Sequence, residues 1–75
     1  MAVVNEPAPP PFFTPAEIRQ LREENCVTRA AFADGLNVSG DTVGRWEAGT
    51  MRPSGAARRL LGVVQKHGFR LVADA

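Results

Sequence analysis

The residues of this sequence best suited to chemistry are its arginines. The chain of 75 residues has nine basic residues, and eight of them are arginine. Arginine carries planar, paired donors that match a phosphate or the edge of a guanine base. One of them, Arg45, lies in the stretch VSGDTVGRWEAG, close to Asp41 and Thr42. Two interpretations of the arginine excess are open: contacts with nucleic acid, and a coding bias at high GC content.

Side chains that commonly carry catalysis or bind metal ions are scarce. Cys26 is the only cysteine and His67 the only histidine. The sequence therefore predicts no internal disulfide and no zinc site. No nucleophile, base and orienting group stand at a recognisable spacing. We expect no enzymatic activity, no metal and no cofactor.

Length and charge favour a small binding domain. A chain of this size buries only about 60% of its unfolded surface, which leaves little room for an enclosed active site. The net charge of +1 is weak evidence for nucleic acid, so the placement of charge matters more than its sum. No apolar run approaches the roughly 18 residues of a membrane span, and the start does not resemble a secretory signal. We expect a cytoplasmic, nucleoid-associated protein.

Capping residues divide the chain into helices. Thr14-Pro15-Ala16-Glu17 combines a capping threonine, a proline at the first helical position and a glutamate three residues after the cap. Thr28, Ser39 and Ser54 can cap three more helices. The predicted helices are residues 15–25, 28–36, 39–48 and 54–67. Their expected inward residues are Ile18, Leu21, Phe32, Ala33, Leu36, Val43, Trp46, Ala57, Leu60, Leu61 and Val64. The sequence predicts an all-α domain over residues 12–68.

The two ends of the chain differ from this pattern. Residues 1–11 hold four of the six prolines and predict an extended, disordered tail, with a proline-rich ligand for another domain as the alternative. Residues 69–75 fit a short strand, a docking arm or a frayed end. The candidate dimer surface consists of Val63, Val64, Phe69, Leu71 and Val72. In the alternative interpretation, Val64 and Phe69 only close the core.

Two short helices joined by Asn37-Val38 form a helix-turn-helix pattern. Asparagine tolerates the left-handed conformation with which a chain leaves a helix. Such a turn lets the second helix stand across the first, and its amino-terminal end can then enter the major groove of DNA. The stretch from Ser39 to Ala48 is therefore the predicted recognition helix.

The segments FTPAEIRQLREEN, TRAAFADGLNVS, DTVGRWEAGTMRPS and ARRLLGVVQKHG resemble the phage-repressor and Cro family, also called the xenobiotic-response-element family. Within it, the chain most resembles antitoxins of the HigA and related types. The resemblance covers about residues 14–68 and implies a lambda-repressor-like domain of four to five helices, with the helix-turn-helix at the second and third.

The resemblance also gives structural roles to particular residues. It implies that Trp46 is buried between helices and that Glu47 pairs with Arg22. Cys26 stands where the family usually has a glycine, and a cysteine with positive φ would be strained. Either Asn25 takes the left-handed conformation instead, or the turn differs.

The same resemblance implies where DNA would be contacted. The expected base contacts are Arg45, Thr42, Asp41 and Gly40, with Asp41 either accepting from cytosine or favouring the helix amino terminus. The expected phosphate contacts are Arg29, Thr28, Ser39, Gly44, Thr50, Arg52 and Ser54. Close approach of the backbone to DNA would explain the glycines, and so would chance. Arg58 and Arg59 lie either on a solvated face or at a partner interface.

The implied function is a sequence-specific repressor of its own operon, bound as a homodimer to an inverted repeat in double-stranded DNA. If the likeness to HigA-type antitoxins holds, a second partner is a small ribosome-dependent RNA-cleaving toxin. The alternative is a protein-binding module on the same fold that does not bind DNA, such as an anti-activator or a toxin-neutralising protein.

Overall fold

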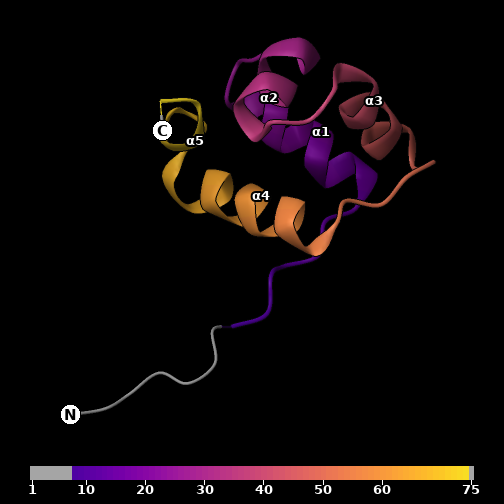
Figure 1. Ribbon diagram of the computed structural model, residues 1–75, viewed down its shortest axis with the longest axis horizontal. Coiled ribbons are helices and arrows are strands. Elements are labelled where there is room, and N and C mark those ends of the chain that lie inside the picture. The colour runs from indigo at the N-terminus through magenta and orange to yellow at the C-terminus, as the bar shows by residue number, and fades with distance from the viewer. Residues whose placement is uncertain (1–7, 75) are drawn as a thin grey trace.

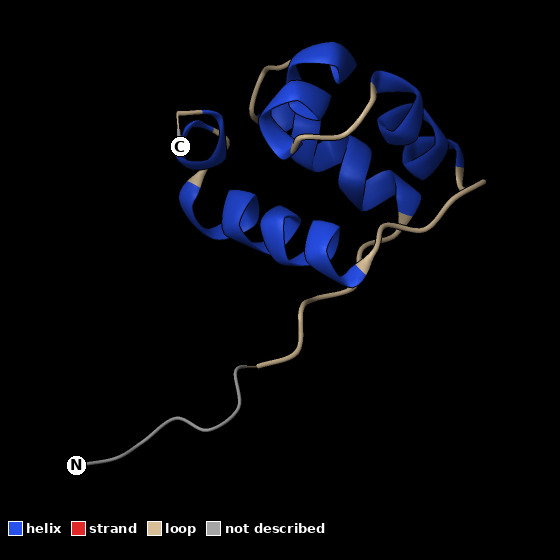
Figure 2. Ribbon diagram, viewed as in Figure 1, coloured by secondary structure: helices blue, strands red, loops and turns tan. Residues whose placement is uncertain are grey.

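The computed structural model describes residues 8–74, and within this range the chain folds into five helices without a strand (Figures 1 and 2). Their bounds are α1 Pro15–Glu24, α2 Arg29–Leu36, α3 Gly40–Ala48, α4 Gly55–His67 and α5 Arg70–Ala73. The all-α prediction is confirmed. None of these helices has the length and apolar character needed to cross a membrane.

The helices pack around one apolar core. In Figure 1, α1 crosses the middle of the molecule, with α2 and α3 on one side and α4 on the other. The short α5 turns back from the end of α4 and packs against α2. Eleven buried apolar side chains form the core: Ile18, Leu21, Phe32, Ala33, Leu36, Val43, Trp46, Ala57, Leu61, Val64 and Phe69.

Hydroxyl side chains begin the four longer helices. The Oγ1 of Thr14 accepts from the amide of Glu17 at 3.1 Å, and the Glu17 carboxylate accepts from the amide of Thr14 at 2.8 Å. Thr28, Ser39 and Ser54 each cap their helix in the same way, by accepting from the amide three residues on. These bonds satisfy amides that have no partner within the helix. Helix starts therefore follow from local sequence.

The first three helices end on a residue in the left-handed conformation. Cys26 and Asn37 both have φ of 57°, and Gly49 has φ of 79°. Each is followed by an amide that donates back five residues, as from Val38 to the carbonyl of Ala33 at 2.9 Å. This is the Schellman arrangement. Of the two alternatives for Cys26, the one in which Asn25 takes this role was wrong, since Asn25 has φ of −87°.

The segment after α4 is a short helix closed onto the core. Phe69 is buried and stacks on Phe32, with ring centroids 5.5 Å apart. A Cβ built on Gly35 would lie 2.4 Å from the Phe69 ring, so Gly35 leaves the space that this ring fills. The Oδ1 of Asn25 also accepts from the amide of Phe69 at 3.0 Å. Of the alternatives drawn from the sequence, the strand is wrong, because Arg70–Ala73 form a helix, while a docking arm stays a prediction.

The candidate dimer surface is reduced by this packing. Val64 and Phe69 are buried in the core, so neither is available to a second copy. Val63 and Val72 are half-buried, and Leu71 remains 53% exposed.

The proline-rich segment lies against α4 where the structure describes it. Arg58 donates to the carbonyls of Pro10 and Pro11 at 3.1 and 3.4 Å, and Arg59 donates to that of Ala8 at 2.8 Å. Residues 8–11 belong to the segment that was expected to be extended and disordered, and they form no helix or strand. For residues 1–7 that expectation lies outside the described residues.

Candidate nucleic-acid interface

One face of α3 is turned away from the core. Val43 and Trp46 are buried and hold the helix against the rest of the domain. Asp41, Arg45 and Ala48 are exposed on the opposite side. Because positions four and seven residues apart share one side of a helix, these three form a single stripe. Sequence reasoning had not included Ala48, whose methyl group lies on the same face.

The two charged side chains of this stripe form an ion pair. The Nε of Arg45 lies 2.9 Å from the Oδ2 of Asp41, and both side chains are more than half exposed. An exposed pair of this kind contributes little to stability. Its consequence is geometric, since the carboxylate lies nearest to Nε and the terminal nitrogens of the arginine donate no hydrogen bond to residues 8–74.

Two glycines leave the rest of this face flat. A Cβ built on Gly40 or Gly44 would meet no atom within 4 Å. Packing within the domain therefore does not require a glycine at either position. Without side chains there, the backbone of α3 is open to close approach by a ligand.

The remaining predicted reader, Thr42, lies at the edge of the face and is half-buried. Its hydroxyl is 2.8 Å from the hydroxyl of Ser39, and its amide donates to the same Ser39 oxygen at 3.1 Å. Thr42 thus takes part in the cap of α3. Ser39 accepts in that cap, but a hydroxyl can accept and donate together.

Three helix starts offer similar donors for an anion. Thr28, Ser39 and Ser54 use an oxygen lone pair in the cap, at 3.1 Å from the amide in each case. Helix amino termini carry partial positive charge and amides without a helical partner, so they attract phosphate. All three residues were predicted as phosphate contacts, and all three are exposed.

Behind this face, Glu47 joins three elements. Its carboxylate accepts from Arg22 at 2.7 Å (Nε) and 3.0 Å (Nη2), and from the Nε of Arg29 at 3.2 Å. Arg22 also donates to the carbonyl of Val27 at 3.1 Å. The Glu47 side chain is 3% exposed and that of Arg22 is 13% exposed. The network ties α3 to the end of α1 and to the start of α2.

The charges and hydrogen bonds of this network shift the pKa values of Glu47 and Arg22. Burial acts to raise the pKa of Glu47, but hydrogen bonds from Arg22 and Arg29 and the charges of both arginines outweigh it, so the pKa of Glu47 is lowered. The hydrogen bond to Glu47 raises the pKa of Arg22, although burial opposes this shift. Glu47 is therefore ionised at neutral pH.

Arg29 belongs to this network and still reaches solvent. Its side chain is 56% exposed, and only its Nε is engaged by Glu47. The terminal nitrogens have no hydrogen-bond partner among residues 8–74. Arg29 was predicted as a phosphate contact, and its terminal nitrogens fit an anion placed beside the start of α2.

The loop between α3 and α4 contains the last predicted phosphate contacts. Thr50 and Arg52 are exposed. The amide of Thr50 donates to the carbonyl of Arg45 at 3.0 Å, which closes the end of α3. The loop then leads to Ser54 at the start of α4, so Arg52 lies two residues before a helix amino terminus.

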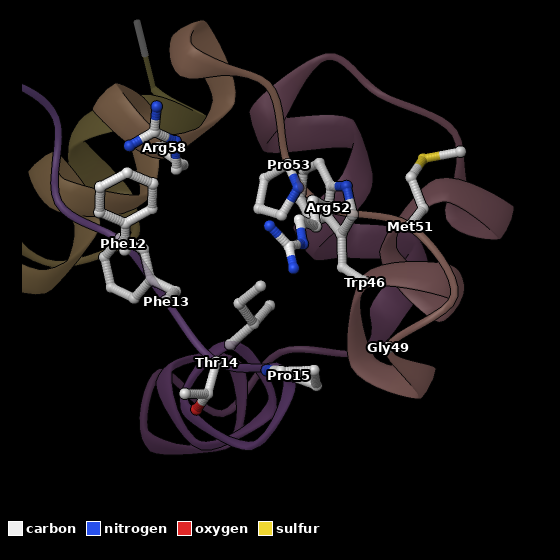
Figure 3. A pocket seen from close by; sticks show the side chains of 11 residues that line it. Phe12, Phe13, Thr14, Pro15, Trp46, Gly49, Met51, Arg52, Pro53 and Arg58 are labelled. Carbon is white, nitrogen blue, oxygen red and sulfur yellow. The ribbon is translucent and has the colours of Figure 1, made fainter.

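A cleft of about 470 Å³ lies between this loop and the segment that precedes α1 (Figure 3). One side is formed by Phe12, Phe13 and Pro15, and the other by Met51 and Pro53. Figure 3 shows the Arg52 side chain reaching into the space between the two sides. None of its lining residues is an aspartate, glutamate, histidine or cysteine. The cleft therefore offers no general acid or base.

Arg58 borders the same cleft and is engaged by the proline-rich segment. Its guanidinium lies over the ring of Phe12, 4.1 Å from the centroid. A Cβ on Gly62 would come within 3.1 Å of Pro11, so Gly62 lets this segment lie close to α4. Sequence reasoning had left Arg58 and Arg59 between a solvated face and a partner interface, and had missed this contact. A contact between two segments that are far apart in sequence gives no local signal.

Comparison with known proteins agrees with this geometry. Residues 16–65, which are 50 of the 75, match the model of a family described as a helix-turn-helix domain. The chain is also 41% identical over 54 residues to "Antitoxin HigA-2" of Vibrio cholerae serotype O1, a match that covers 72% of the chain. It spans about half of that relative, 52% of its length.

Proposed function

This chain belongs to the helix-turn-helix family of DNA-binding domains, and from that premise we propose that it is a sequence-specific transcriptional regulator. The observation that carries the proposal is the exposed face of α3, with Asp41 and Arg45 outward and Val43 and Trp46 buried behind them. A helix fixed in this way can enter the major groove as a rigid unit.

The proposed contacts follow from position and chemistry. Arg45 reads a base edge, with Thr42, Asp41 and Gly40 beside it, because arginine can donate two bonds to guanine O6 and N7. Phosphates are bound by the flanking residues Arg29, Thr28, Ser39, Gly44, Thr50, Arg52 and Ser54. Phosphate contacts supply affinity and orientation, and base contacts supply the choice of sequence. Since only one arginine stands on the stripe of α3, most of the affinity comes from the flanking contacts.

We further propose that the protein acts in the cytoplasm as a dimer on an inverted repeat and represses its own operon. One module reads few base pairs, and two-fold symmetry doubles the site with half-sites about one helical turn apart. Leu71, exposed on α5, is the strongest remaining candidate for the dimer contact. The name of the Vibrio relative supports a further role as an antitoxin. A small ribosome-dependent RNase is the partner that the resemblance to HigA-type antitoxins implies, and we propose it here on that ground.

The test is footprinting of the purified protein on its own promoter, followed by affinity measurements at several salt concentrations. If each protomer of a dimer neutralises two phosphates through Arg29 and Arg52, log K falls with log salt at a slope of about −3.6. We expect protection of an inverted repeat and a slope of this size. Absence of any protection at low salt would refute the proposal.

A second candidate function is a protein-binding module that does not bind DNA. The near-neutral charge and the pairing of Arg45 with Asp41 on the face of α3 favour it. In that case Arg45→Ala leaves the amount of DNA retained by the protein unchanged. The affinity for a protein partner also lacks the steep decrease with rising salt that phosphate contacts cause. The footprint and the salt slope distinguish the two functions.

A further inference from the structure

Asp41 and Arg45 are the only charged side chains on the exposed face of α3. They are joined through the Nε of Arg45 and the Oδ2 of Asp41 at 2.9 Å. Their neighbours on this face are Gly40, Gly44 and Ala48, which are too small to bond to either of them. The direction of the arginine is therefore set by one partner, the aspartate one helical turn before it.

This ion pair leaves the end of the guanidinium available. Nε is the nitrogen of Arg45 nearest to the Asp41 carboxylate, and neither Nη1 nor Nη2 donates a hydrogen bond to residues 8–74. Those two nitrogens can donate two parallel bonds, which match O6 and N7 of guanine. Adenine presents a donor where guanine has O6, so it cannot accept the second bond.

We propose that Asp41 is a positioning residue that aims the end of Arg45 at one guanine of the operator. The inference rests on the proposed function and names what this part of the site recognises. A long side chain held before binding loses less freedom when it binds. The pair has no net charge, so it contributes to the choice of base more than to the attraction of phosphate.

The alternative role for Asp41 is direct reading of a cytosine through N4. The contact nearest to Arg45 is made by Oδ2, and an ionised carboxylate can accept further bonds, so the chemistry alone permits this role. The two roles differ in their consequence. A positioning residue changes the preference at the base pair that Arg45 reads, whereas a direct reader changes the preference at its own base pair.

The experiment uses the full chain and its footprinted operator, with each base pair of a half-site replaced in turn. Affinities are measured for the wild type, Asp41→Asn, Arg45→Ala and the double variant. Glu23→Gln is the matched control. Glu23 pairs with the Nε of Arg19 at 2.7 Å with the same four-residue spacing, is exposed, and loses the same charge on substitution.

We expect Arg45→Ala to lose roughly 5- to 150-fold of the preference for guanine at one base pair. Asp41→Asn is expected to lose at least about 5-fold at that same base pair, the lower end of the range. The double variant should then equal Arg45→Ala at that base pair, because two residues that act as one unit do not add. Glu23→Gln should leave every preference unchanged.

Two results would overturn the inference while leaving the proposed function intact. In the first, Asp41→Asn changes the preference at a different base pair. In the second, it changes no preference beyond the Glu23→Gln control, although Arg45→Ala does. If the wild type does not distinguish among the operator variants at all, the proposed function fails and the inference fails with it.

Discussion

Replacing Arg22 by methionine tests whether the Glu47 network holds the domain together. Methionine keeps the apolar stem of the arginine and removes its charge. The substitution deletes three hydrogen bonds, two to the Glu47 carboxylate and one to the carbonyl of Val27. It leaves a carboxylate that is 3% exposed with Arg29 as its one remaining partner.

The expected loss is large for a domain of this size. Removing one partner of a buried ion pair costs about 3–5 kcal/mol. Because Arg29 still pairs with Glu47, we expect a loss at the lower end of this range, about 3 kcal/mol. At about 0.05–0.15 kcal/mol per residue, 75 residues give a total stability of roughly 4–11 kcal/mol. The midpoint of thermal unfolding should fall by about 12–24 °C.

The sign of the pH dependence follows from Glu47. Its folded pKa is lowered in the wild type, so the stability it contributes is fully present above the unfolded pKa of about 4.3 and is lost as the pH falls through the lowered folded pKa. In Arg22→Met, the hydrogen bonds and charge of Arg22 no longer oppose the effect of burial on Glu47, so the pKa of Glu47 rises. The penalty of the substitution is therefore greatest at neutral pH and shrinks toward pH 4.

Urea unfolding of the wild type and Arg22→Met at pH 7 and at pH 4.5 measures both effects. Arg19→Met is the matched control, because Arg19 pairs with Glu23 on an exposed surface and should lose no more than about 0.5 kcal/mol. The reasoning fails if Arg22→Met costs no more than Arg19→Met. It also fails if the difference between wild type and Arg22→Met is the same at both pH values.

Three further substitutions test other parts of the structure. Gly44→Ala should stabilise the free domain by about 1 kcal/mol, because its Cβ meets nothing within 4 Å; a loss in urea unfolding would contradict this. If α3 faces DNA closely, the same variant binds the operator more weakly. Phe69→Ala should cost about 3–5 kcal/mol by loss of the ring on Phe32, and thermal melts showing under 1 kcal/mol would place α5 outside the core. Cys26→Gly should stabilise the domain by about 0.5–1 kcal/mol, because removing the strain of a cysteine with positive φ outweighs the conformational entropy that glycine adds to the unfolded chain. An unchanged urea midpoint would argue against such strain.

The helices could be predicted because their starts and stops depend on neighbouring residues. Each predicted boundary of the four longer helices lies within one residue of the structure. A hydroxyl that accepts from an amide three residues on is encoded entirely within that short segment. The same holds for Asn37 and Gly49, which suit the left-handed end of a helix.

Cys26 shows where local preference was overruled. By itself, cysteine disfavours positive φ. At this position the amide of Cys26 donates to the carbonyl of Glu23 at 2.9 Å, and Arg22 donates to the carbonyl of Val27. The turn is thus held by bonds on both sides of Cys26, and these fix its conformation.

Contacts between distant segments left no local pattern to recognise. The stacking of Phe69 on Phe32 joins positions 37 residues apart, and a fifth helix of four residues, Arg70–Ala73, follows Phe69. The proline-rich segment lies against α4 through the bond from Arg59 to the carbonyl of Ala8. Both depend on surfaces that exist only after the core has formed.

By itself, the sequence determined the four longer helices, the buried face of each and the abundance of arginine, because caps and apolar periodicity act over a few residues. It could not distinguish one arginine from another. The tertiary structure decided that: Arg22 is committed to Glu47, and Arg58 and Arg59 bind the carbonyls of the proline-rich segment. Arg29 and Arg45 are held at Nε by a carboxylate, with their terminal nitrogens open to a ligand. Because all of these arginine side chains have the same chemistry, the fold decides which partner each of them binds.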